Sequence, residues 1–190
     1  PSGTWMVYTA NREGDLNVWV RNLESGKEMQ VTHKLGYDGG AVFSPNAAQI
    51  VWRASYPITD EEKADYSALL DQDLIRPTHL NLYMADRNGE HVRQLTTVDA
   101  ADFCPVFLPD SQHLMFSSNR LDPQKREFDL FILNLKNGTT KRVTAAPGFD
   151  GFPMPSYSGR LMAFCSNRNP SHEGNTNVFV AEWIDPDINE

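Results

Sequence analysis

The sequence predicts an all-β fold of the β-propeller class with one short helical insertion. The first observation behind this prediction is the stretch 102–144, where four short runs rich in apolar and aromatic residues are divided by Pro-Asp, a charged loop and Asn-Gly. Runs bounded by such turn residues are typical of strands. Four of them in succession predict one antiparallel four-stranded meander.

The second observation is that this unit recurs in one register. Aromatic residues mark the second run at Tyr8, Trp52, Phe116 and Phe164, and the third run at Trp19, Tyr83, Phe131 and Phe179. The fourth run ends at Thr32, Thr96 and Thr144, which are separated by 64 and 48 residues. The first run begins, at the same steps, with Asp38, Asp102 and Asp150. A period of about 40 to 50 residues with four strands per unit is the sequence mark of a propeller blade.

Taken in order, the repeats divide a single propeller segment into four blades at about 1–35, 36–99, 100–147 and 148–184. Pro1 falls in the turn before a second strand, so the first blade lacks its inner strand, and the last blade lacks its fourth. We therefore expect the C-terminal part of a larger propeller, with two complete blades and with the missing blades upstream of Pro1. Unpaired strand edges of this kind favour association.

The second blade departs from the repeat at 57–76. Its two central aromatic residues are 31 residues apart, against 11, 15 and 15 in the other blades. The insertion predicts a helix over 60–74, because Thr59 and Glu62 form a capping box and Pro77 follows. Its apolar stripe is Tyr66, Leu69, Leu70 and Leu74. The stripe either docks on the rim of the propeller or forms a partner-binding or lid helix.

Composition excludes several classes of function. With 17 basic and 25 acidic residues the net charge is -8, which argues against nucleic acid, since binding phosphates needs a basic face. No apolar run approaches the roughly 18 residues of a transmembrane segment. The two cysteines, Cys104 and Cys165, fall in different strands and are expected to pack as small residues. There is no G-x-S-x-G elbow, and the five histidines lack metal-ligand spacing.

In a meander alternate turns share a face, so the turns between blades and the loops after the second strands emerge together. The candidate ligand-binding residues on that face are Asp38, Asp102, Asp150, Tyr37, Phe103, Phe149, Arg120 and Arg168. Three converging carboxylates would favour a cation such as Ca²⁺ or a basic group of a partner. Alternatively, each aspartate accepts backbone N–H groups of its own turn. The arginines tie neighbouring blades together or bind an anion.

The triplets Ala10-Asn11-Arg12, Ser118-Asn119-Arg120 and Ser166-Asn167-Arg168, each followed by an Asn/Asp-apolar-aromatic strand, resemble the TolB-type, WD-like β-propeller repeat family. The resemblance covers almost the whole chain. It implies a periplasmic or secreted propeller whose funnel binds a protein or a small ligand; in that family the propeller docks a peptidoglycan-associated lipoprotein. The helical insertion is not part of the repeat.

These observations favour a non-catalytic binding or scaffold propeller that recognises a protein or glycan on its loop-rich face, without a cofactor. Two alternatives from another class remain. The chain could be part of a propeller enzyme that resembles metal-dependent polysaccharide lyases, with histidine ligands in the funnel, or an accessory domain of a hydrolase. The lyase interpretation requires at least three histidines to converge.

Overall fold

The structure is a computed structural model that describes residues 3–76, 79–170, 172 and 174–184. The turn predicted at Pro1 and Ser2, the helix stop predicted at Pro77 and the acidic tail after Ile184 lie outside the described residues. Contacts within the chain divide it into two compact units, Pro1–Pro105 (unit 1) and Val106–Glu190 (unit 2), which are described one at a time.

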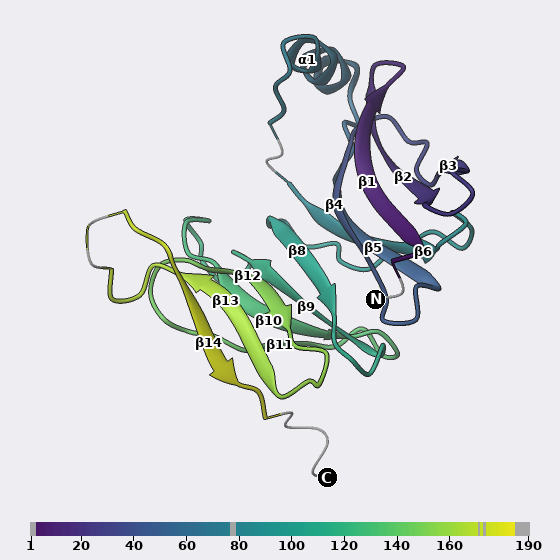
Figure 1. Cartoon of the computed structure of the whole chain (residues 1–190). Helices are drawn as coiled ribbons and strands as arrows, with labels where there is room; N and C mark the ends of the chain where they lie inside the picture. Colours follow the sequence, from purple (N-terminus) through teal and green to yellow (C-terminus); the bar gives the residue numbers. More distant parts are fainter. Residues whose placement is uncertain (1–2, 77–78, 171, 173, 185–190) are drawn as a thin grey trace. The chain divides into compact units, whose positions relative to one another are not determined.

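Unit 1 contains one large sheet in the order β1-β2-β4-β5-β6-β7, with β3 paired to β2 (Figure 1). Its strands are β1 (Trp5–Arg12), β2 (Asp15–Asn22), β3 (Glu28–Gln30), β4 (Tyr37–Phe43), β5 (Gln49–Ser55), β6 (Asn81–Asp86) and β7 (Arg93–Gln94). The predicted strand order of the first two blades is confirmed. A parallel bridge between Leu16 and Tyr37 joins the two blades into a single sheet, which the repeat pattern did not predict.

The first hairpin has a two-residue turn. β1 continues to Arg12 and β2 starts at Asp15, so only Glu13 and Gly14 form the turn. Both have positive φ, 57° and 78°, which matches the twist of a two-residue hairpin. Asn11 and Arg12 are not typical strand residues, but they pair with Leu16 and Asp15 across the hairpin.

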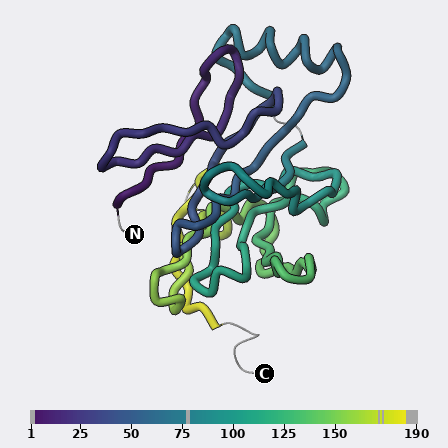
Figure 2. The backbone as a smooth tube through the Cα atoms, turned by 90° about the vertical axis from the view of Figure 1, so that its right-hand side faces the viewer, coloured from purple at the N-terminus to yellow at the C-terminus, as the bar shows by residue number. Residues whose placement is uncertain are grey.

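The insertion forms helix α1 (Asp60–Leu70), which starts with the predicted capping box of Thr59 and Glu62. The helix is shorter than the predicted 60–74, and this is a correction. Asp73 takes a left-handed conformation with φ 58°, and the N–H groups of Asp73 and Leu74 bond back to the carbonyls of Leu70 and Leu69. This is the hydrogen-bond pattern of a Schellman turn, which ends a helix without a proline. Figure 2 shows α1 as a single coil.

Unit 2 contains a sheet in the order β11-β10-β9-β8 and a second in the order β12-β13-β14. The strands are β8 (Asp102–Phe107), which crosses the boundary between the units, β9 (His113–Ser118), β10 (Asp129–Asn134), β11 (Thr140–Arg142), β12 (Asp150–Pro155), β13 (Leu161–Ser166) and β14 (Asn177–Glu182). The four strands predicted for the third blade and the three predicted for the fourth are confirmed.

The aromatic residues of the repeat face each other across the central hairpin of each blade. The paired residues are Tyr8 and Trp19, Trp52 and Tyr83, Phe116 and Phe131, and Phe164 and Phe179. In the last three pairs the rings stack with centroids 5.8–6.0 Å apart. Such cross-strand pairs stabilise a sheet. The predicted register is therefore confirmed, and Trp52 and Phe116 are fully buried in the cores of their units.

The inner strands share an irregularity at one repeat position. The register of β4 shifts between Gly39 and Val42, and that of β12 shifts between Gly151 and Met154. Gly40 in β4, Cys104 in β8 and Phe152 in β12 all have positive φ, of 60°, 50° and 54°. A β-bulge inserts one such residue and bends the strand. The bend lies just after the repeated aspartate in each strand.

Candidate functional site

Asp38, Asp102 and Asp150 open the inner strands as predicted, but their side chains are buried, with exposed fractions of 0%, 0% and 1%. Oδ1 of Asp38 accepts hydrogen bonds from Trp52 Nε1 at 2.8 Å and from the hydroxyl of Tyr56 at 2.6 Å. Burial raises the pKa of Asp38 to about 6, although these hydrogen bonds oppose the shift. The carboxyl of Asp38 thus connects the start of β4 with the end of β5.

The repeated arginines lie over the aromatic pairs of their own blades. The guanidinium of Arg120 lies 4.9 Å and 5.2 Å from the ring centres of Phe116 and Phe131. Arg168 lies in the same way over the pair of the fourth blade and forms an ion pair of 2.6 Å with Asp150. A guanidinium held over aromatic faces is stabilised by the ring quadrupole. Each arginine is thereby fixed within its blade.

The predicted aromatic residues flank the bulges. The hydroxyl of Tyr37 accepts from Arg53 Nη2 at 2.8 Å, and its ring covers Gly39, where a Cβ would collide with it. The ring of Phe149 covers Gly151 in the same way. Phe103 is half-buried at the corresponding place of β8. The ligand-binding role of these aromatic residues, of the aspartates and of the two arginines stays a prediction.

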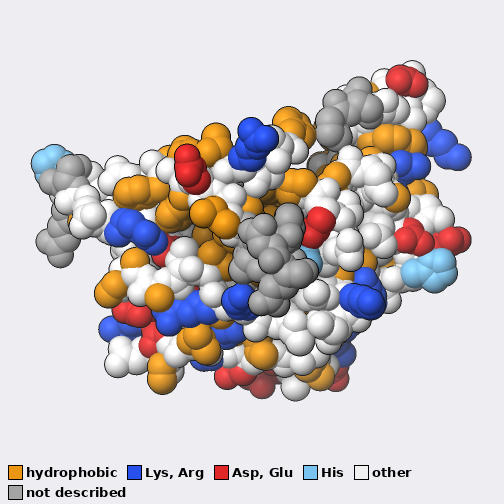
Figure 3. Space-filling view, turned by 90° about the horizontal axis from the view of Figure 1, so that it is seen from below, with side chains coloured by type: hydrophobic (Ala, Val, Ile, Leu, Met, Phe, Trp, Pro, Cys, Tyr) orange, Lys and Arg blue, Asp and Glu red, His pale blue; other side chains and the backbone are white. Residues whose placement is uncertain are grey.

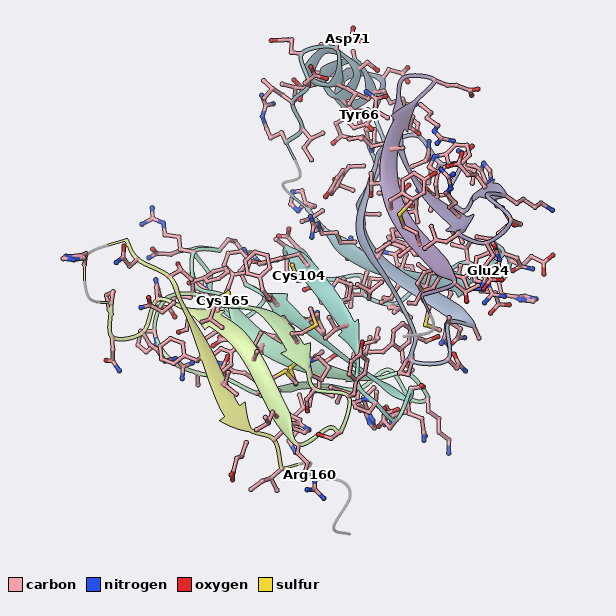
Figure 4. The ribbon with its side chains drawn as sticks, viewed as in Figure 1. Glu24, Tyr66, Asp71, Cys104, Arg160 and Cys165 are labelled. Atoms are coloured by element: carbon pink, nitrogen blue, oxygen red, sulfur yellow. The ribbon has the colours of Figure 1, made fainter. Side chains whose placement is uncertain are left out.

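Helix α1 is fastened to the sheet of unit 1 by Tyr66, whose side chain points from the helix toward the strands (Figure 4). Its hydroxyl lies 2.9 Å from Oδ1 of Asp15 and 2.9 Å from the carbonyl oxygen of Gly36, and it accepts from the N–H of Leu16 at 3.2 Å. Burial raises the pKa of Tyr66. With Leu70 buried as well, this part of the apolar stripe docks on the helix's own unit.

A cavity of about 520 Å³ lies under α1, and of the predicted ligand-binding residues Tyr37 is in its lining. Its aromatic lining consists of Tyr37, Tyr56, Tyr66 and Tyr83. The ring of Tyr56 meets that of Tyr83 edge to face at 5.2 Å, which fixes both. Ile58, which precedes α1, and Leu69, in the last turn of α1, add apolar walls.

The charged groups around the cavity have partners of different kinds. Glu62 accepts the N–H groups of Ile58 at 2.7 Å and Thr59 at 3.0 Å, which lowers the pKa of its carboxyl. Asp65 forms an ion pair of 2.9 Å with Arg76. The ammonium of Lys34 lies 4.2 Å from the ring centre of Tyr56. Cation–π contact of this kind leaves the N–H donors of a lysine available.

Within the described ranges no three or more His, Cys, Asp or Glu side chains form a group that could hold a metal ion. Three histidines are each paired with an aspartate: His79 with Asp99, His91 with Asp86 and His113 with Asp110. In the same part of the chain no helix has the length and apolar character needed to cross a membrane. Figure 3 shows one face, on which Lys and Arg side chains lie among acidic and apolar ones.

Comparison with solved structures places this arrangement among known folds. The chain superposes on TolB from Acinetobacter baumannii with a TM-score of 0.71 and 18% identity, covering 96% of this chain and 39% of that one. A protein assigned as TolB in Agrobacterium tumefaciens gives a TM-score of 0.70 and 19% identity, covering 96% and 58%. The fold is that of a TolB-type β-propeller.

Sequence comparison agrees with this TolB-type fold. The Tol-Pal system protein TolB of Francisella tularensis is 23% identical over 194 residues, covering 86% of this chain and 43% of that protein. The chain thus spans less than half the length of this curated relative. No family model matches the chain. The resemblance to TolB-type repeats that the sequence predicted is confirmed.

Sequence reasoning missed the cavity residues Lys34 and Tyr56 because neither belongs to the repeat. Lys34 stands in the turn between the first two blades, and Tyr56 follows β5 directly. The insertion itself was the available signal. A helix placed between β5 and β6 must pack on nearby residues, such as those just after β5 and just before β6. Tyr66 was noticed as part of the apolar stripe, but its hydroxyl contacts could not be foreseen.

Proposed function

We propose that this chain is a non-catalytic binding propeller that recognises a protein partner through the loops between blades and the insertion α1. The observation that carries the proposal is α1, a helix outside the repeat. It has a capping box, Tyr66 attaches it to the sheet, and a cavity lies beneath it. Function in a rigid repeat scaffold resides in its loops. An anchored insertion adds a shaped surface that the repeat alone does not provide.

In this proposal the repeated aspartates, with Tyr37, Phe103 and Phe149, shape the loops of their own blades, and Arg120 and Arg168 hold the loops of theirs. The hydrogen bonds of Asp38 and the ion pair of Asp150 support this role. By likeness to a Tol-Pal system protein, the proposal includes a periplasmic or secreted location.

The test measures binding of two probes by calorimetry: the soluble domain of a peptidoglycan-associated lipoprotein and a soluble peptidoglycan fragment. The variants are the wild type, a chain with 57–76 replaced by a short Gly-Ser loop, and the control Lys136→Ala in the β10–β11 turn. We expect the lipoprotein domain to bind the wild type and the control alike, and the loop-replaced chain at least tenfold more weakly.

Tighter binding of the glycan than of the protein would overturn the choice of partner. Loss of binding in the Lys136→Ala control alone would overturn the choice of face. Far-UV circular dichroism of each variant separates lost binding from lost folding, since the replaced segment contains the 11 residues of α1 and no strand.

A further inference from the structure

We propose that the cavity under α1 is a binding site for a small organic carboxylate with a flat or branched apolar body. The inference deepens the proposed function by giving the chemistry of one part of the same surface. It rests on three features of unit 1: the volume of the cavity, the kinds of side chain that line it and the state of the charges around it.

The volume and walls fit a small ligand. About 520 Å³ lies within the range of roughly 300 to 1,000 Å³ that is usual for small-molecule sites. Tyr56, Tyr66 and Tyr83 present aromatic surface, and Ile58 and Leu69 present aliphatic surface. The three tyrosine rings are held by hydrogen bonds or ring contacts to the sheet. A wall that is already ordered loses little entropy when a flat apolar group packs against it.

The charges select an anion. Both acidic side chains of the lining already have partners, Glu62 two backbone N–H groups on Oε2 and Asp65 the guanidinium of Arg76, which weakens their attraction for a cationic ligand. Among the described basic residues of the lining, Arg76 is paired with Asp65, and the imidazole of His79 contacts Asp99. Lys34 has no ion pair in the described part of the chain and lies over Tyr56.

Lys34 is placed so that it can bind the carboxylate of the ligand while the apolar body of the ligand packs on the tyrosine walls. Its ammonium lies 4.2 Å from the centre of the Tyr56 ring, so a carboxylate that meets this ammonium brings its body onto the tyrosine walls. A flexible lysine gives a point charge rather than a two-pronged contact, which suits a single carboxylate. The buried Asp38, hydrogen-bonded to the hydroxyl of Tyr56, works against any anion there. We therefore expect a Kd of about 1 mM, weak for a site of this size.

The experiment titrates the whole chain with phenylacetate and with phenylacetamide, which has the same shape without the charge, using ligand-observed NMR. The variants are Lys34→Met and the matched control Lys27→Met, an exposed lysine of unit 1 that does not line the cavity. Replacing Lys34 should weaken phenylacetate binding about fivefold, the usual size of a partly exposed ion pair, and Lys27→Met should change it less than twofold. Phenylacetamide should bind every variant equally weakly.

Equal binding of the acid and the amide by the wild type would overturn the proposal, as would an equal loss in both lysine variants. Tighter binding of the neutral disaccharide cellobiose than of phenylacetate would also overturn it. Ile58→Ser is a second variant that removes an exposed wall without touching the core, and it should weaken phenylacetate about threefold. Unchanged affinity in this variant would contradict the assignment of the apolar wall.

Two further probes identify the source of the carboxylate: the peptide Ala-Ala-Ala-Phe with a free C-terminus and the same peptide amidated. Binding of the free peptide at least as tight as that of phenylacetate, with loss on amidation, assigns the site to a protein C-terminus. Binding of phenylacetate alone assigns it to a free acid. Both results support the carboxylate site. Because these probes bypass the lipoprotein domain, a failed protein partner and a failed carboxylate site are distinguished.

Discussion

The hydroxyl of Tyr56 lies 2.6 Å from Oδ1 of Asp38, which is fully buried. This hydrogen bond connects a wall of the cavity under α1 with the inner strand β4 of the second blade. Trp52 Nε1 donates to the same oxygen at 2.8 Å, while Oδ2 is buried without a hydrogen-bond partner in the described part of the chain. A buried carboxyl with only one satisfied oxygen makes stability depend on protonation.

The first prediction concerns pH. Burial raises the pKa of Asp38 from 3.8 to about 6, so between these values the folded chain binds a proton that the unfolded chain does not. Stability should therefore fall as pH rises from about 4 to about 6 and then level off, a change of at most about 3 kcal/mol from this group. The measurement is urea unfolding of the wild type and Asp38→Asn, whose difference should carry that slope.

A control for this prediction is Asp122→Asn. Backbone N–H groups of Glu127, Gln124 and Arg126 lower the pKa of Asp122, so its contribution is present above about pH 4 and is lost as pH falls further. The two aspartates should thus show opposite trends. A flat difference between wild type and Asp38→Asn across pH 4 to 6 would contradict the assignment.

The second prediction concerns the aromatic register. Trp52 and Phe116 are fully buried and stack on Tyr83 and Phe131 of the neighbouring strand. Phe116→Ala should cost about 3 to 5 kcal/mol of unfolding free energy, because a cavity replaces the ring. Phe152→Ala is the matched control, since its ring is 52% exposed, and it should cost about 1 kcal/mol or less. Denaturant titration compares the two, and equal costs would contradict the register.

The third prediction concerns the attachment of α1. Tyr66→Phe removes a hydroxyl that touches Asp15, Leu16 and Gly36 but keeps the ring. We expect the local stability of α1 to fall by about 1 kcal/mol. The change should be observed mainly as faster amide hydrogen exchange in α1, while the strands keep their protection. Gln72→Ala just after the helix, whose side chain donates to the carbonyl of Ala68 within the same segment, serves as the control. Equal exchange in both variants would show that the helix is held by other contacts.

The fourth prediction concerns β14, which ends its sheet. Its outer edge is paired with no strand in the described ranges, and Val178 and Val180 are 72% and 65% exposed. Exposed apolar edge strands pair with other chains. We expect concentration-dependent association in sedimentation velocity, reduced by Val178→Lys together with Val180→Lys. A monodisperse monomer at all concentrations of the unmodified chain would contradict this.

The repeat made most of the fold predictable, because the aromatic residues and aspartates recur at fixed steps and each strand keeps its period. The length of α1 was not predictable, since the Schellman turn depends on Asp73 adopting a left-handed conformation, which an aspartate does only where its surroundings require it. The parallel bridge between Leu16 and Tyr37 was likewise invisible, because one pair of residues leaves no periodic trace.

The site was less predictable than the fold. The sequence identified the repeated aspartates as candidate ligands, since a column of carboxylates looks alike whether it faces solvent or the interior. Burial of Asp38 depends on Trp52 and Tyr56, which approach it only after the strands pair. The cavity under α1 is assembled from residues of the turn before β4, the end of β5, α1 and β6, and its shape exists only once these elements have packed.

The bulge in the inner strands bears on how proteins of this kind are recognised. Glycine, cysteine and phenylalanine occupy the same left-handed position at Gly40, Cys104 and Phe152, so the neighbouring strands impose the bend and the residue at the bend only tolerates it. At such a position the backbone conformation is kept while the amino acid can change. Divergent copies of this repeat would then keep the same backbone bend after their amino-acid sequences have ceased to align.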